Sequence, residues 1–195
     1  GAGAGADAFF VALRIPNFLR RLFAEGAFAQ AFVPVLAEYK NQRDHAAVRE
    51  LVESTLGALG CILLLLTMAG ILAAPWVIGL FAPGFEVGTD GKHELATQML
   101  RITFPYLLFI SLSALAAGAL NTYERFGVPA FTPVLLNLAM IGCALFLAPH
   151  LETPAVALAW GVLLGGIMQL AFQVPFLARV GLAVWPRVRR GHDGV

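Results

Sequence analysis

The chain has 195 residues, of which 59% are hydrophobic and 13% charged, and its mean hydropathy is +0.79. Soluble domains carry about a quarter of their residues as charges, so this composition excludes an ordinary soluble domain. A formal net charge of +1 leaves no basic surface of the kind that nucleic-acid-binding domains use. The composition points to a protein that lies in a lipid bilayer and has membrane lipids, not nucleic acid, around it.

The first apolar segment, predicted to cross the bilayer over residues 8–38, contains a row of polar side chains. Asp7, Arg14 and Arg21 are spaced by seven residues, which rotates each by only about 20° from the last on a helix. Two further polar residues lie four positions on either side of Arg21, on the same side of the helix. We therefore predict a polar stripe that consists of Asp7, Arg14, Asn17, Arg21 and Glu25. Arg20 lies about 100° away from Arg21 around the helix.

The two adjacent arginines of this segment lie deep in the bilayer. Arg20 and Arg21 are roughly 20 Å along the helix axis from Asp7, and a charge at such depth costs at least about 2.5–3.5 kcal/mol. The stripe should therefore face other helices or a water-filled cavity. Because the planar guanidinium fork suits phosphate, these residues predict a site for a phosphate-bearing anion. Two alternatives stay open: Arg21 and Glu25 form a structural ion pair, or the segment is an amphipathic helix on the membrane surface.

The same segment is too long to be one straight crossing. Thirty-one helical residues would reach about 46 Å, whereas the hydrocarbon core is about 30 Å thick. Proline removes a hydrogen-bond donor and clashes one turn back. We expect Pro16, Gly26 and Pro34 to bend the segment, by a kink near Pro16 or an early helix end before Pro34.

Four later segments contain no charged side chain over more than the roughly 20 residues that a crossing needs. They predict an all-α fold, a polytopic transmembrane bundle of about five helices, whose later spans are 54–82, 98–121, 128–148 and 154–177. Within the last span, Gly161, Gly165 and Gly166 form a small-residue face. Such a face permits close helix contact, and packing within the chain is favoured over a dimer interface.

The basic residues predict the orientation of the bundle, because positive charge marks the cytoplasmic side. They gather around residues 40–49, at Arg125 and in the tail 179–195, which should face the cytoplasm. The alternate loops, residues 85–96 and 150–153, should face outside, and Lys92 is the one basic residue in them.

Motifs for catalysis or metal binding are missing from the sequence. Cys61 and Cys143 lie in apolar runs, and the histidines show no spacing typical of metal ligands. There is no phosphate-binding loop and no nucleophile elbow. We therefore expect that the protein is not an enzyme and that it binds no metal and no cofactor. The chain begins without Met and ends on a basic, Gly-containing tail, and we expect both ends to continue into a longer polypeptide.

The first segment also carries a resemblance to a known family. Its run from Ala6 to Phe28, ADAFFVALRIPNFLRRLFAEGAF, closely resembles the second transmembrane helix of the MurJ (MviN) lipid II flippases. The pattern continues through Gln30–Pro34 and Glu38–Lys40. Shorter matches extend it over essentially the whole chain: Ala74–Trp76, Ala82–Phe85, Thr103–Tyr106, Asn121–Thr122 with Arg125–Phe126, and Pro129–Phe131 with Pro133 and Asn137.

The resemblance implies a multi-pass protein of the bacterial inner membrane in the exporter superfamily of multidrug and polysaccharide transporters. Such a protein moves undecaprenyl-pyrophosphate disaccharide-pentapeptide, the peptidoglycan precursor, from the cytoplasmic to the outer leaflet for cell-wall synthesis. It has two lobes around a central cavity. This chain would be most of the N-terminal lobe, with 179–195 as tail or inter-lobe loop, and its partner would be the remainder of the same polypeptide.

By matched position, the cavity residues of the family's second helix carry over to Asp7, Arg20 and Arg21, and Arg14 stands where the family has Lys or Arg. Asn17 and Glu25 are possible supporting residues. Alternative functions are a related exporter of another lipid-linked glycan or a drug, and a non-transporting structural membrane subunit.

Overall fold

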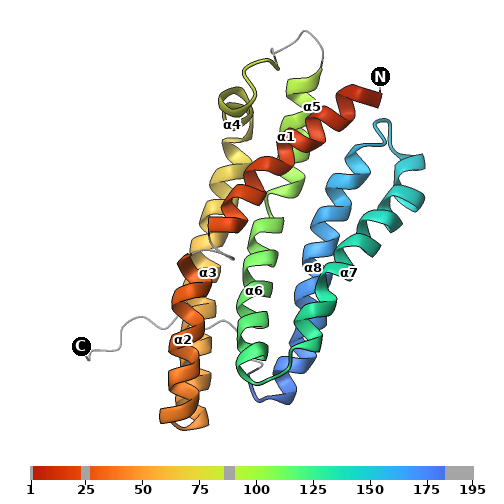
Figure 1. Cartoon of the computed structure of the whole chain (residues 1–195). Helices are drawn as coiled ribbons and strands as arrows, with labels where there is room; N and C mark the ends of the chain where they lie inside the picture. The colour runs from red at the N-terminus through yellow and green to blue at the C-terminus, as the bar shows by residue number, and fades with distance from the viewer. Residues whose placement is uncertain (1, 23–26, 86–90, 183–195) are drawn as a thin grey trace.

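The computed structural model describes residues 2–22, 27–85 and 91–182, and within these ranges the chain is helical and contains no strand. Its helices are α1 (Ala2–Arg20), α2 (Ala27–Gln42), α3 (His45–Leu72), α4 (Ala74–Phe81), α5 (Lys92–Thr103), α6 (Tyr106–Thr122), α7 (Gly127–Gly142) and α8 (Val156–Arg179). A turn of π-helix, Cys143–Leu147, and a 3₁₀ turn, Ala148–His150, extend α7. Figure 1 shows an elongated bundle in which α7 and α8 form an antiparallel pair beside α6.

Four helical stretches of the described chain are long and apolar enough to cross a membrane: His45–Leu72, Lys92–Thr122, Gly127–His150 and Val156–Arg179. They overlap the four later spans that the sequence predicts, and the all-α membrane fold is confirmed. Neither α1 nor α2 is among the four stretches. The five-crossing count and the span boundaries therefore stay predictions.

The first segment is not one uninterrupted helix, as predicted. Pro16 lies inside α1 and Pro34 inside α2, and α1 ends at Arg20 whereas α2 begins at Ala27. The two helices run in different directions (Figure 1). Gly26, the third residue expected to contribute, lies outside the described residues.

Two predicted spans are divided by prolines. In the predicted span 54–82, α3 ends at Leu72 and α4 begins at Ala74, with Pro75 in its first turn. In the predicted span 98–121, α5 gives way to α6 at Pro105. Proline lacks the N–H that would continue the ladder, so it is tolerated at the start of a helix and ends the one before it.

The interior of the bundle consists of two apolar clusters, one at each end. The upper core (in the orientation of Figure 1) joins α1, α3, α4, α5, α6 and α8 through residues that include Ala8, Ala12, Leu63, Ile78, Met99 and Leu107. The lower core joins α2, α3, α6 and α8 through Phe32, Leu36, Val48, Val52, Leu120 and Leu177. Since α3, α6 and α8 contribute to both cores, they hold α1 at one end of the bundle and α2 at the other.

The glycines of α8 make room for its two neighbours. A Cβ on Gly161 would lie 2.8 Å from the Cα of Met140 on α7, and one on Gly166 would lie 2.7 Å from the ring of Tyr106 on α6. These glycines pack within the chain, which is the predicted role. Two buried glutamines add polar contacts: Gln169 donates to the Thr132 carbonyl of α7 at 3.0 Å, and Gln173 donates to the Ser113 carbonyl of α6 at 3.2 Å.

Candidate functional site

Helix α1 has a packed face and an open face. Ala8, Ala12 and Ile15 are buried in the upper core, at 0%, 0% and 6% exposure. At about 100° per residue, Asp7 and Arg14 lie on the opposite side of α1, and Arg21 follows in the π-helical turn just after it; all three are exposed. These three members of the predicted stripe therefore lie on the side of the first helix that the described part of the chain leaves uncovered.

The other predicted residues lie at the edge of this open face or outside the description. Arg20, about 100° from Arg21, is half-buried at the boundary between the two faces, and so is Asn17. Glu25 lies outside the described residues, so the alternative of a structural Arg21–Glu25 pair is untested. The packed face of α1 favours a helix within the bundle over one that lies flat on the membrane surface.

The acidic member of the stripe, Asp7, is paired with a residue of another helix. Its Oδ2 lies 3.5 Å from the Nζ of Lys92, the first residue of α5. Arg14 is seven residues further along α1, about 10 Å along the axis, and Arg20 and Arg21 are about twice as far. Asp7 is therefore paired with Lys92 at the end of α1 that is distant from Arg20 and Arg21.

The end of the bundle predicted to face outside is held together by side-chain contacts to helix ends. Arg101 donates through Nε to the Ile71 carbonyl, in the last turn of α3, at 3.2 Å. His93 Nε2 lies 3.1 Å from the Pro75 carbonyl of α4. These contacts provide partners for carbonyls where α3 gives way to α4, because helix ends and proline-broken turns lack backbone donors.

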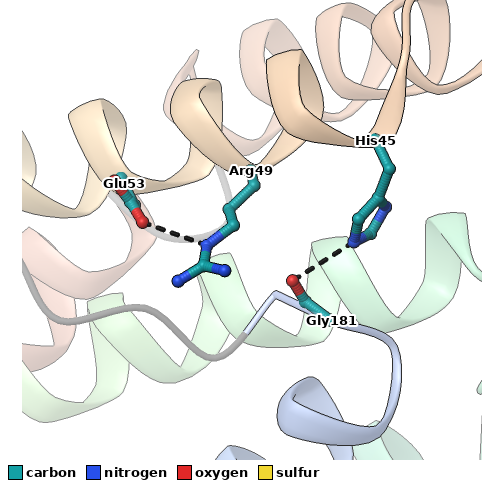
Figure 2. A network of polar contacts seen from close by, with 4 residues as sticks. All are labelled: His45, Arg49, Glu53 and Gly181. Carbon is teal, nitrogen blue, oxygen red and sulfur yellow. Dashed lines mark hydrogen bonds and ion pairs between the residues drawn. The ribbon is translucent and has the colours of Figure 1, made fainter.

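The opposite end, predicted to be cytoplasmic, contains a second polar network. His45, at the start of α3, lies 3.3 Å through Nε2 from the Gly181 carbonyl after α8, and Arg49 pairs with Glu53 at 3.2 Å (Figure 2). His45 Nδ1 also lies 3.5 Å from the hydroxyl of Tyr123, and burial raises the pKa of that phenol. This network joins the ends of α3, α6 and α8, and these contacts include none of the described stripe residues Asp7, Arg14, Asn17 and Arg21.

No group of three or more His, Cys, Asp or Glu side chains that could hold a metal ion is found in the described ranges. The candidate site is therefore the open face of α1 with Asp7, Arg14, Arg20 and Arg21, to which the structure adds Lys92. Sequence reasoning missed Lys92 as a site residue. Its isolation as the one basic residue in the loops predicted to face outside is the signal that could have found it.

Comparisons with known proteins agree with this description. The family model "Lipid II flippase MurJ" matches residues 1–195. A lipid II flippase MurJ of Burkholderia cenocepacia is 52% identical over 183 residues, which cover 93% of this chain and 35% of that protein. A probable lipid II flippase MurJ of Haemophilus influenzae is 49% identical over 201 residues, 100% of this chain and 39% of that protein.

A solved structure has the same fold. "Lipid II flippase MurJ, inward closed conformation" superposes with a TM-score of 0.73 at 29% identity, over 90% of this chain and 36% of that one. The chain thus spans a little over a third of the length of these relatives, between 35% and 39%. With a match over all 195 residues, the chain belongs to the MurJ family of lipid II flippases, helical transport proteins of the bacterial inner membrane.

Proposed function

We propose that the intact protein moves lipid II from the cytoplasmic to the outer leaflet of the inner membrane, and that this chain is most of its N-terminal lobe. The family match over the whole chain carries the proposal. The open face of α1 supports it, because Arg14 and Arg21 are exposed on a helix whose other face is buried in the lobe. A charged face at membrane depth requires water or another helix beside it.

In the proposed mechanism, the cationic face of α1 neutralises the pyrophosphate, and the cavity between the lobes holds the polar sugar and peptide. Arg20 and Arg21 donate to phosphate oxygens, and Arg14 extends the positive surface toward the outer side. The two lobes rock about this site to expose it to each side in turn. The polyprenyl tail stays in lipid through a lateral opening.

This transport makes and breaks no covalent bond, so the protein acts as a transporter and not as an enzyme. Free energy for net movement comes from an ion gradient, from the membrane potential or from consumption of lipid II outside. A related exporter of another lipid-linked glycan would use the same cationic face. A structural subunit would instead use the arginines in ion pairs and would need no hydrated cavity.

The test is replacement of the two adjacent arginines in the intact protein. Arg20→Ala and Arg21→Ala should each abolish growth of a strain depleted of its own flippase, at near-normal protein abundance. A charge-assisted contact contributes about 1.5–3 kcal/mol, which corresponds to about tenfold or more in substrate loading. Replacement of either arginine by Lys should restore growth only partly, because Lys keeps the charge and loses the bidentate fork.

Arg125→Ala is the matched control, since Arg125 is also an exposed arginine but lies between α6 and α7. It should support normal growth. A structural role predicts instead that Arg21→Ala lowers the amount of folded protein. Normal growth with both Arg20 and Arg21 replaced would end the substrate-binding proposal.

A further inference from the structure

Lys92 occupies a position that local helix chemistry disfavours. It is the first residue of α5, and the preceding Gly91 makes no side-chain cap. The N-terminus of a helix carries partial positive charge, so a cation there is opposed by the helix dipole. It is also the one basic residue in the two loops predicted to face outside. A lysine at this position is therefore explained neither by the stability of α5 nor by the distribution of basic residues along the chain.

The contacts of Lys92 lead to two other helices. Its Nζ lies 3.5 Å from Asp7 Oδ2 on α1, and 5.7 Å from the centroid of the Phe85 ring, just after α4. A carboxylate can accept several hydrogen bonds, so a contact to Oδ2 leaves Oδ1 of Asp7 available to another group. Lys92 therefore fixes the carboxylate at the outer end of the α1 stripe and leaves part of it open.

This ion pair contributes little to the stability of the lobe. The Asp7 side chain is 58% exposed and that of Lys92 is 30% exposed, and exposed pairs have small net effects. Helix α1 is already held by Ala8 and Ala12, both fully buried in the upper core. A weak, exposed contact beside a strong apolar one can break and re-form without unfolding the helix.

We propose that Lys92 is a positioning residue of the transport cycle, which holds Asp7 and the outer end of α1 against α5 while the cavity is closed to the outside. This inference rests on the proposed function. The pair breaks when the outer end of the stripe becomes accessible from outside. Lys92 thus acts through Asp7 and without contact to the substrate.

The test uses the intact protein with Cys61 and Cys143 replaced by Ala and a reporter cysteine at Phe10. Phe10 is 61% exposed, lies on α1 between Asp7 and Arg14, and is not among the residues proposed to bind the substrate. The rate at which an impermeant thiol reagent labels Phe10→Cys from outside measures how often the outer end is open. Growth of the depleted strain is measured alongside, with protein abundance.

Lys92→Gln should raise the labelling rate about fivefold, which corresponds to about 1 kcal/mol, the upper end for an exposed pair. It should also slow growth at normal abundance. Lys92→Arg should restore both readouts, since it restores the positive charge. Glu94→Gln is the matched control, because Glu94 is exposed in the same first turn of α5, and it should change neither readout.

An unchanged or lower labelling rate in Lys92→Gln would overturn the proposal, and so would normal growth. A loss of protein abundance without faster labelling of the remaining protein would show a purely structural contact and would also overturn it. The failure of this proposal can be distinguished from the failure of the proposed function. If Arg20 and Arg21 proved dispensable while Lys92→Gln still accelerated labelling, substrate binding would fail and the outer contact would stand.

Discussion

Replacement of Gly161 by Ala should weaken the contact between α7 and α8. A Cβ at this position would lie 2.8 Å from the Cα of Met140, and 3.4 Å from both the Ala139 carbonyl oxygen and the Cβ of Cys143. Carbon atoms pack best about 3.5–4.0 Å apart, so the backbone of α7 must retreat by about 0.7–1.2 Å. Because the obstacle is backbone, a side-chain rotation cannot relieve it.

Two effects of opposite sign determine the magnitude. Overpacking of a filled interior costs about 1–3 kcal/mol, whereas Ala in a helix is more favourable than Gly by about 0.8–1.0 kcal/mol. Gly60, in α3, allows the two effects to be measured separately, because a Cβ there would meet no heavy atom within 4 Å and would cause no overpacking. Gly60→Ala should show only the propensity gain. Gly161→Ala should therefore be about 1–3 kcal/mol less stable than Gly60→Ala.

The assay is reversible unfolding of the intact protein in mixed detergent micelles, with the two variants and the wild type measured in the same series. Gly161→Ala should unfold at a lower denaturant concentration than Gly60→Ala. Equal stability of the two variants would refute the reasoning, since it would mean that α7 yields to the added methyl group without cost.

Two further predictions concern the cytoplasmic end and the orientation. Gly181 has a φ of +77°, and a Cβ there would lie 2.5 Å from His45 Nε2. Gly181→Ala should therefore lower stability by about 1–2 kcal/mol from the left-handed backbone alone, and His45→Ala should relieve only the remaining, steric part in unfolding measurements. For the orientation, a cysteine at Asn41 should be protected from impermeant thiol reagents in intact cells and one at Glu152 should be labelled; external labelling at Asn41 would contradict the assigned topology.

The four helical stretches that are long and apolar enough to cross a membrane were predictable because each is encoded in a continuous stretch of sequence. The uncharged run that begins at Thr153 and the helix α8, Val156–Arg179, nearly coincide. Breaks within helices were harder to place. Pro75 and Pro105 each begin a new helix, whereas Pro16 and Pro34 lie inside helices. A proline is compatible with either outcome, and packing against neighbouring helices determines which occurs.

The open face of α1 was predictable for a similar reason. A spacing of seven residues places Asp7, Arg14 and Arg21 on one side of any helix, and the apolar residues between them mark the other side. The partner of Asp7 was not predictable, because Lys92 lies on a helix 85 residues away. Only the packing of α5 against α1 in the upper core brings the two side chains together.

The end of α1 provides an argument for a hydrated cavity that does not depend on the substrate. Arg20 is in the last turn of α1, about 20 Å along the axis from Asp7. The last carbonyls of a helix lack intrahelical donors, and at membrane depth such groups are tolerated only within protein or beside water. A cation in the last turn stabilises the negative end of the helix dipole. Arg20 is thus a cation at the end of α1 where a cation is favoured, and Arg21 follows it as an exposed residue; we propose that these two arginines border a hydrated cavity in the intact protein.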